Sequence, residues 1–512
     1  MLLRFISRLL SVSVIGAYGG EWTAISVGCP GGFWQNPPMR SKWTLVVEGL
    51  GRIERAEVEL RPLTLFVGEN NSGKSYLSSL LWDFLARMPD VFSFNRSELN
   101  TLAESAAYQA CSRWLDDKIS RLGEYTLTEE DISLLLSWFN ERLEEKKDAV
   151  AQRIFGRSSM TVDRFEVRDL CLDAPLSLVF RRSAQGLVGD VNFTARGYAP
   201  LEPRKLEVEL EPDHDPSSPT HRTVLIALLA QLLAPYRPIG YQGSEYDPGD
   251  ALYLPASRTG FMLLYKGVLA NLIDRGLASM TDPKRSPSPN LQLTAPTLHF
   301  LQALALGLKP SSPGRFAAEA DLIERHAFPG TVALAGSVGV NEVEYRYDPA
   351  EPPLPMQLSS SLITELAPLI LVLRHAKDLP FLVLEEPEAH LHPHLQRLVA
   401  QVIARLVRQG VYVCVTTHSA DFCQQINNFI KLGSIPPELR VDFQDQYGYE
   451  AQDYLEAREV GGYQFRVGEG GRAAVTRLEE SPSGLAMPTF NQELIDLSKQ
   501  TLDLQRAVEG EG

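Results

Sequence analysis

The chain has 512 residues, of which 49 are Lys or Arg and 64 are Asp or Glu, so its formal net charge is −15. This length is too great for one hydrophobic core and indicates about two to four domains. The acidic balance excludes a protein covered uniformly with basic side chains for nucleic acid, although a local basic groove stays open. Hydrophobic residues make up 44% and charged residues 22%, values that exclude an intrinsically disordered chain.

The cysteines and the apolar segments bear on where the protein works. The five cysteines are scattered and form no C-x-x-C pair, so neither a disulfide framework nor a zinc ribbon is indicated, and we expect a cytoplasmic protein. No apolar run reaches the ~18 residues of a membrane-spanning helix. The sequence therefore predicts no membrane partner.

The first 38 residues differ in composition from the rest. Arg4 and Arg8 precede a short apolar stretch, which is compatible with a signal peptide. The segment that follows is rich in Gly, Pro and Trp without periodicity, and Met39 directly precedes a well-patterned strand. These features favour a disordered or mis-annotated extension over a signal peptide for residues 1–38.

Residues 39–95 are expected to form an N-terminal lobe of strands and one helix. Short strand-like runs alternate with the breakers Gly49, Gly51 and Pro62, and a helical pattern follows Ser75.

Residues 96–330 are expected to be an inserted helical and α+β region. Thr128 and Asp131 have the spacing of a capping box at the start of a long amphipathic helix. Residues 163–211 return to strand-like alternation, and residues 282–296 form a loop rich in Pro and Ser. The helices contain no long heptad run, which disfavours a coiled-coil arm.

Residues 331–440 are expected to form a C-terminal lobe of the same domain, and residues 441–512 a C-terminal hairpin and helix. The stretch 331–347 itself has the pattern of a hairpin.

The strongest motif is GENNSGKS, which fits G-x-x-x-x-G-K-[ST] and follows an apolar strand. The two glycines let backbone N–H groups face phosphates, and the following helix N-terminus adds a partial positive charge. Lys74 is expected to reach the β- and γ-phosphates and the Ser75 hydroxyl to bind Mg²⁺. The predicted nucleotide-binding residues are Gly68, Glu69, Asn70, Asn71, Ser72, Gly73, Lys74 and Ser75.

A second motif, FLVLEEPE, has an apolar run that ends in two carboxylates. Burying Glu385 and Glu386 at a strand end is costly without a cation, and a Mg²⁺–phosphate site would offset that cost. We expect Glu385 to face Mg²⁺ and Glu386 to orient or deprotonate the attacking water.

A third apolar run, VYVCVTTHS, places His418 at its polar end, where it could hydrogen-bond the γ-phosphate and the attacking water.

Three further histidines follow the acidic motif with H-x-H spacing. Because Pro393 interrupts them and no cysteine lies nearby in sequence, a zinc site is disfavoured there. They are His390, His392 and His394.

The order of these motifs resembles a known family. GENNSGKS, then LSSSLITELAPL, FLVLEEPEAHLHP and TTHSADF are similar to segments of ABC-type ATPase heads. The closer resemblance is to AAA-type ATPases grouped with the overcoming-lysogenization-defect (OLD) nucleases and with ATPase subunits of Septu-, Gabija- and PARIS-type antiphage systems. It covers residues 42–435 and implies ATP and Mg²⁺ as ligands. The implied fold is α/β, an ABC-ATPase-like head with a mixed sheet and an inserted helical and α+β subdomain. Residues 39–95, with the P-loop, and residues 331–440 would be the two lobes of this ATPase head.

The resemblance also implies a homodimer that sandwiches two ATP molecules. A serine of the segment 358–362 would meet the partner's γ-phosphate, and Ser360 is the candidate, although the glycine that usually follows is absent. Glu385 stands where an Asp is usual. The segment YLPASRTGF is similar to one in stand-alone members, and Arg258 within it fits a buried structural role or a phosphate-sensing one.

The chain has no visible effector domain. The residues after His418 show no Toprim pattern, because Asp442, Asp445 and Asp453 are not a strand-end glutamate followed by D-x-D. We therefore expect an ATPase with a separate nuclease or Toprim-type effector, serving antiphage defence or DNA processing, with nucleic acid as a further candidate partner. The alternatives are a nucleotide-gated scaffold with little turnover and a DNA-repair-type ATPase.

Overall fold

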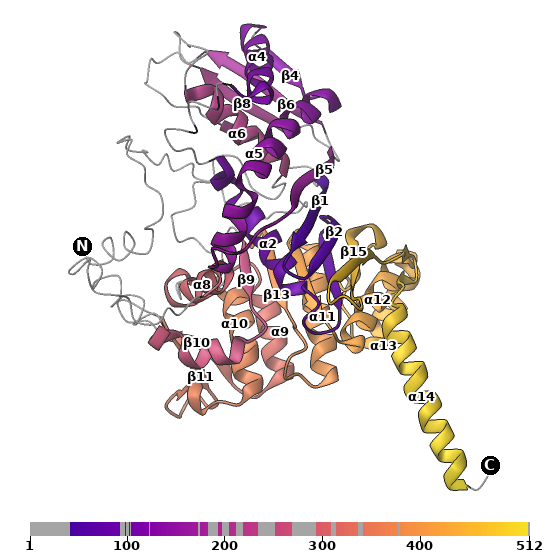
Figure 1. Cartoon of the computed structure of the whole chain (residues 1–512). Helices are drawn as coiled ribbons and strands as arrows, with labels where there is room; N and C mark the ends of the chain where they lie inside the picture. Colours follow the sequence, from indigo (N-terminus) through magenta and orange to yellow (C-terminus); the bar gives the residue numbers. More distant parts are fainter. Residues whose placement is uncertain are drawn as a thin grey trace.

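The computed structural model describes residues 41–92, 98, 102, 104–121, 123–172, 175–182, 193–196, 204–210, 219–233, 251–268, 293–308, 314–335, 341–376 and 379–509. A mixed sheet of nine strands, covered by helices, forms the centre of the molecule, which confirms the predicted α/β class (Figure 1). Its strand order is β5-β1-β2-β16-β15-β3-β14-β13-β9. These strands are β1 (Ser41–Leu50), β2 (Ile53–Glu59), β3 (Leu63–Gly68), β5 (Arg164–Leu172), β9 (Leu252–Leu254), β13 (Phe381–Glu385), β14 (Tyr412–Thr417), β15 (Val460–Val467) and β16 (Ala473–Arg477).

One half of this sheet is parallel. β3, β14, β13 and β9 run side by side in the same direction, with Glu385 opposite Thr416 and Thr417 opposite Val67. Every residue of β3, β13 and β14 is buried, as expected for strands covered on both faces. The carboxyl ends of these strands therefore lie along one edge of the sheet, which is where α/β proteins bind ligands.

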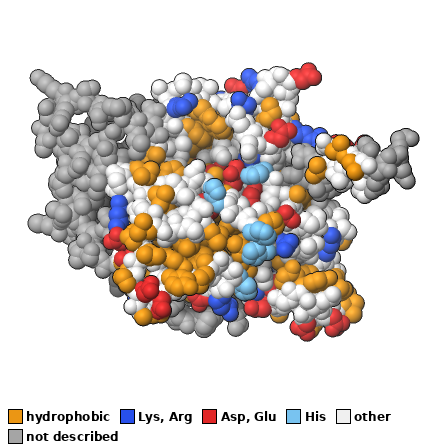
Figure 2. Space-filling view, turned by 90° about the horizontal axis from the view of Figure 1, so that it is seen from below, with side chains coloured by type: hydrophobic (Ala, Val, Ile, Leu, Met, Phe, Trp, Pro, Cys, Tyr) orange, Lys and Arg blue, Asp and Glu red, His pale blue; other side chains and the backbone are white. Residues whose placement is uncertain are grey.

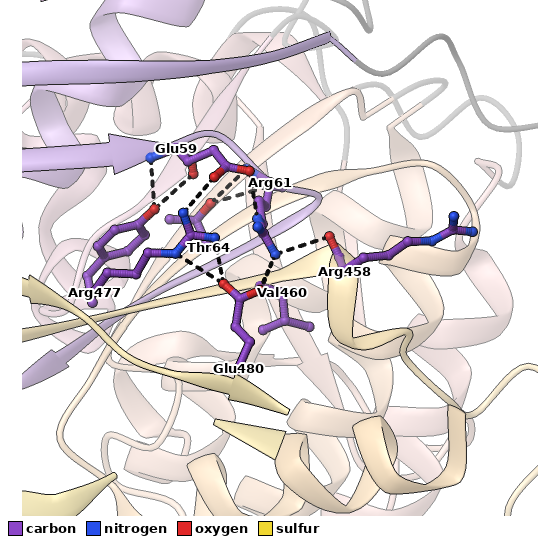
Figure 3. Close-up of polar contacts among 8 residues, drawn as sticks. Glu59, Arg61, Thr64, Arg458, Val460, Arg477 and Glu480 are labelled. Atoms are coloured by element: carbon purple, nitrogen blue, oxygen red, sulfur yellow. Dashed lines mark hydrogen bonds and ion pairs between the residues drawn. The ribbon is translucent and has the colours of Figure 1, made fainter. Parts of the chain in front are cut away.

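The other half is mostly antiparallel and joins the two ends of the described chain. β1 pairs with β2 and β5, β15 pairs antiparallel with β16, and β15 also runs parallel to β3. Ion pairs reinforce this junction (Figure 3): Arg61 contacts Glu59 at 2.9 Å and Glu480 at 2.5 Å. Arg477 in turn contacts Glu59 at 2.6 Å and Glu480 at 2.7 Å, so residues more than 400 positions apart share one charge network.

Side chains of the parallel strands alternate between two hydrophobic clusters. On one side, Leu65, Leu384 and Val415 pack in a cluster with residues of helices α9 to α12. On the other side, Phe66 and Val383 pack with residues of α2, α5 and α6. The helices are α2 (Lys74–Arg87), α4 (Ala106–Arg121), α5 (Glu129–Phe155), α6 (Pro219–Leu233), α8 (Ala295–Gln302), α9 (Ala317–Ala327), α10 (Ser361–His375), α11 (Pro393–Arg408), α12 (Ala420–Ser434), α13 (Pro437–Tyr447) and α14 (Pro488–Glu509).

A smaller unit lies beside the head, in the upper part of Figure 1. Its sheet has the order β4-β6-β8-β7, formed by β4 (Gly123–Thr126), β6 (Leu176–Arg182), β7 (Phe193–Arg196) and β8 (Arg204–Leu210). The predicted capping box at the start of α5 is confirmed, because the Thr128 side chain accepts a hydrogen bond from the Asp131 N–H and the Asp131 carboxylate accepts one from the Thr128 N–H. That carboxylate also accepts hydrogen bonds from Trp114 and Tyr125, so one buried acid joins α4, β4 and α5.

The remaining elements are short. The predicted hairpin is confirmed as β10 (Thr331–Ala335) paired antiparallel with β11 (Glu342–Arg346). The others are β12 (Leu354–Pro355), β17 (Glu480–Ser481), β18 (Gly484–Leu485) and the single turns Met88–Phe92, Ala303–Gly307, Met356–Leu358 and Ala457–Glu459. In the part of the chain that the structure describes, no helix has the length and apolarity needed to cross a bilayer.

The central sheet crosses the segment boundaries expected from the sequence. It takes strands from residues 39–95, 96–330, 331–440 and 441–512 alike. Hydrogen bonding therefore joins β5 and β9 of the expected insertion, and β15 and β16 of the expected C-terminal hairpin, to the head. The expected extension 1–38 and most of the expected loop 282–296 lie outside the described residues.

Candidate functional site

The GENNSGKS motif, residues 68–75, lies between β3 and α2 in the structure. Gly68 has φ 149° and Gly73 has φ 98°, backbone conformations that residues other than glycine rarely adopt. A Cβ at Gly68 would lie 2.4 Å from the Phe465 carbonyl oxygen, and one at Gly73 would lie 2.9 Å from Ile53. The two glycines are thus required both by the curl of the loop and by strands that pack behind it.

Lys74 is the first residue of α2, and its side chain turns back over the loop. Its Nζ donates hydrogen bonds to the carbonyl oxygens of Gly68 at 2.8 Å and Glu69 at 2.6 Å. Burial lowers the pKa of Lys74, and nearby carboxylates, Glu386 first among them, oppose that shift. The ammonium group is therefore held close to a cluster of negative charge, in the position from which it can move to a phosphate.

Glu385 ends β13 and is almost completely buried. Its Oε1 accepts a hydrogen bond from Ser78 Oγ at 3.2 Å, and its Oε2 accepts one from the Ala256 N–H at 3.3 Å. The Tyr253 hydroxyl lies 3.3 Å from the same Ser78 Oγ. Burial, and then the charge of Glu385, raise the pKa of Tyr253 well above its usual value, so this hydroxyl stays neutral.

Glu386 adopts a left-handed backbone conformation with φ 42°, which costs about 1–3 kcal/mol for a residue other than glycine. Its N–H donates to the Thr416 carbonyl oxygen at 2.8 Å, which fixes the turn against the neighbouring strand. Its side chain is 30% exposed and so can reach a ligand. Four non-glycine residues among those described have positive φ, and three of them, Asn71, Glu386 and His390, belong to the candidate motifs; the fourth is Asp169.

His418 follows β14 and faces the acidic motif. Its Nδ1 lies 3.8 Å from Glu386 Oε1 and 3.2 Å from Glu388 Oε1. Glu388 Oε1 also accepts hydrogen bonds from the His418 N–H at 2.7 Å and from Thr417 Oγ1 at 2.8 Å. Glu388 therefore fixes the loop that presents the imidazole next to Glu386.

The residues present fit a Mg²⁺ ion that is completed by a nucleotide. Ser75 lies exposed on the first turn of α2, and Ser78, one turn later, is hydrogen-bonded to Glu385. A hydroxyl and a carboxylate are oxygen ligands of the kind that Mg²⁺ takes alongside phosphates and waters. Glu388 Oε2 is buried without a hydrogen-bond partner, so this region contains an acceptor that no side chain satisfies. Among the described residues, no group of three or more His, Cys, Asp or Glu side chains is placed to hold a metal alone.

Ser360 caps the N-terminus of α10 and is exposed. Its Oγ accepts a hydrogen bond from the Ile363 N–H at 3.4 Å.

Arg258, whose role the sequence leaves open, is buried: its Nη1 donates to the Glu385 carbonyl oxygen at 2.5 Å and its Nη2 to the Glu386 carbonyl oxygen at 3.0 Å. The structure thus assigns Arg258 to the end of the acidic strand rather than to the surface.

Figure 2 shows histidine side chains gathered on one face, around acidic side chains and beside apolar ones. Four of the exposed histidines belong to the acidic motif and to the loop after β14: His390, His392, His394 and His418. His392 Nδ1 and His394 Nδ1 lie 2.9 Å apart.

Several contacts at this site were not predicted from the sequence. Most of them involve residues whose local sequence does not indicate a functional role, because a serine within a helix or a tyrosine in a short strand is common in protein cores. Only Glu388, in the quoted acidic motif, had a visible signal, a third carboxylate next to a buried strand. The residues in question are Ser78, Tyr253, Glu388 and Thr416.

Comparison with known proteins places the chain in a family. Residues 63–423 match the family described as "AAA domain, putative AbiEii toxin, Type IV TA system". The chain belongs to this AAA-domain family. The match spans the P-loop, the acidic strand and the His418 loop, so the chain is a P-loop ATPase module by family. No curated protein matches.

Solved structures with a similar chain include heads of SMC proteins. One is an Smc head bound to the C-winged helix domain of ScpA, with 14% identity, TM-score 0.34, and coverage of 86% of this chain and 98% of that one. The SMC head domain from Thermotoga maritima has 10% identity, TM-score 0.29, and coverage of 86% and 99%. The Smc head with an extended coiled coil, bound to the C-terminal domain of ScpA from Pyrococcus furiosus, has 11% identity, TM-score 0.35, and coverage of 91% and 100%.

Proposed function

We propose that this member of the AAA-domain family is a Mg²⁺-dependent ATPase that hydrolyses ATP as a homodimer. The observation that carries the proposal is the meeting of two motifs at one sheet edge. Glu385, at the end of β13, accepts a hydrogen bond from Ser78 on α2, the helix that begins at Lys74 of the P-loop. A phosphate-binding loop and a buried carboxylate thus face the same space.

Each residue has a chemical task in this proposal. The N–H groups of the loop and the Lys74 ammonium hold the β- and γ-phosphates, so the bonds of Lys74 to loop carbonyls are exchanged for bonds to phosphate oxygens. Ser75 and Glu385 hold Mg²⁺, which neutralises charge on the phosphates when it is bound. Glu386 accepts a proton from the attacking water, and His418, 3.8 Å from it, donates a hydrogen bond to the γ-phosphate or orients that water.

The homodimer is supported by groups that this chain exposes. Ser360 lies exposed at a helix N-terminus, whose partial positive charge favours an anion such as a phosphate. Leu358, just before it, is 72% exposed, and Leu264 is 64% exposed. Gln357 donates a hydrogen bond to the Leu263 carbonyl oxygen at 3.4 Å, so the two exposed leucines belong to adjoining segments. Apolar surface next to a phosphate-binding helix end is suited to burial against a second head.

The biological task that we propose is antiphage defence, with a separate effector protein. The motif order resembles that of antiphage ATPase subunits, and the family description names a toxin of a type IV system. Helix α14 projects from the head (Figure 1), and its apolar side chains are largely exposed, as a partner-binding helix would be; they include Leu497, Leu502, Leu504 and Val508. The net charge of −15 favours protein partners over non-specific DNA.

Steady-state ATP hydrolysis by the full-length chain tests this function. We expect Mg²⁺-dependent turnover whose specific rate rises with protein concentration, because the active site needs two heads. Turnover that double-stranded DNA changes would support a DNA-sensing task. Slow turnover with stable ATP-bound dimers, indifferent to DNA, would support the nucleotide-gated scaffold. The proposal is wrong if no nucleotide binds.

A further inference from the structure

Arg258 contacts two of the candidate motifs from a third segment. It lies just after β9, and its side chain is only 3% exposed. Besides the carbonyl oxygens of Glu385 and Glu386, it reaches helix α10: Nη2 lies 2.5 Å from Glu365 Oε1, and Nε donates to the Glu365 carbonyl oxygen at 3.3 Å. One guanidinium group therefore joins the end of the acidic strand to the helix that Ser360 caps.

The first turn of α10 lacks one of the backbone hydrogen bonds that would join it to the rest of that helix. Pro368 lies inside the helix and has no N–H, so it cannot bond to the Thr364 carbonyl four residues earlier. Thr259 contacts this first turn as well: its N–H and Oγ1 donate to Glu365 Oε2 at 3.1 and 2.8 Å, and its Oγ1 lies 3.2 Å from Thr364 Oγ1. The two neighbouring residues 258 and 259 thus both bond to the start of α10.

The chemistry of this contact requires an arginine. Burying an ion pair is costly, and Glu365 is only 1% exposed. The cost is offset when a planar guanidinium, with donors in fixed directions, satisfies several acceptors at once. Here the acceptors are one carboxylate, two carbonyl oxygens at the acidic motif, one carbonyl in α10 and the Pro255 carbonyl at 3.1 Å. A lysine has fewer donors and no fixed plane.

We propose that Arg258 is a positioning residue that couples nucleotide binding in one head to the presentation of Ser360 to the other. The proposal rests on the function proposed above. A change at the Glu385–Glu386 peptide on nucleotide binding is passed through the guanidinium to Glu365, and so to the first turn of α10. The loaded head then presents Ser360 in the orientation that the partner's nucleotide needs.

Two variants and one matched control test this coupling. Arg258→Lys keeps the positive charge and removes the planar guanidinium group. Glu365→Gln keeps the shape of the side chain and removes the ion pair. The control is Arg405→Lys, because Arg405 on α11 forms an equally buried pair with Asp453, with Nε 2.5 Å from Oδ1. ATP affinity is measured on dilute protein with a fluorescent nucleotide, and ATP-dependent dimerisation by analytical ultracentrifugation, all in full-length chains that carry Glu386→Gln. Melting temperatures report the loss of stability.

Arg258→Lys and Glu365→Gln are expected to keep ATP affinity within about twofold and to weaken ATP-dependent dimerisation about tenfold. Arg405→Lys is expected to lower the melting temperature without changing dimerisation. The coupling is refuted if Arg258→Lys dimerises as the parent does, if it loses ATP affinity and dimerisation in equal measure, or if Arg405→Lys weakens dimerisation as much. Failure of the parent itself to bind ATP or to dimerise would instead refute the proposed function.

Discussion

Replacing Lys74 with Ala is expected to abolish measurable ATP binding and to lower turnover by about 100- to 1,000-fold. The Lys74 ammonium is the cation that the loop holds over its own carbonyl oxygens, 2.8 Å from Gly68 and 2.6 Å from Glu69. Without it, the phosphates would enter a region that contains Glu385, Glu386 and Glu388 with no mobile positive charge to meet them. Equilibrium binding of a fluorescent ATP analogue measures the loss.

The matched control is Lys431→Ala, because Lys431 lies exposed on α12. It should bind and hydrolyse ATP as the parent does. The assignment of Lys74 to the phosphates is contradicted if Lys74→Ala binds ATP with unchanged affinity while its melting temperature shows that it is folded.

Replacing Glu386 with Gln is expected to leave ATP binding intact and to slow hydrolysis by about 100-fold or more. The amide keeps the size and the polar contacts of the side chain but cannot accept the proton of the attacking water. The strained backbone at this position, with φ 42°, is held by the N–H bond to Thr416, which the substitution leaves in place. ATP should therefore accumulate unhydrolysed in a stable dimer.

Single-turnover hydrolysis and size-exclusion chromatography with ATP measure the two effects. Glu438→Gln, which changes an exposed carboxylate on α13, is the control and should turn over normally. If Glu386→Gln hydrolyses ATP at the parental rate, the proton is taken elsewhere, and His418 becomes the residue to change next.

The motifs that bind and hydrolyse nucleotide in this proposal could be located from the sequence because each is local. A glycine-rich loop, an apolar strand that ends in two glutamates and a strand that ends in His418 are all visible within ten residues. The capping box of α5 and the hairpin β10–β11 were predicted for the same reason. Periodicity and capping act over one or two turns, so a single segment carries the signal.

The arrangement between segments could not be predicted in this way. β9 has only three residues, too few to show a period, yet its pairing with β13 brings Tyr253 and Arg258 to the site. β15 lies nearly 400 residues from β3 and pairs with it in parallel. Pairing of distant parallel strands is decided by burial in the whole sheet rather than by local pattern. The roles of Glu388 and Arg258 depend on that assembly.

The central claim is that each ATP is hydrolysed between two heads, and the measurement that tests it most directly mixes two inactive variants. Lys74→Ala removes the P-loop cation, and Ser360→Arg blocks the helix end offered to the partner. In an equal mixture, half of the dimers contain one intact P-loop facing one intact Ser360, so we expect turnover to recover to about a quarter of the parental rate. A mixture as inactive as its components, or full activity of Ser360→Arg alone, would contradict the claim.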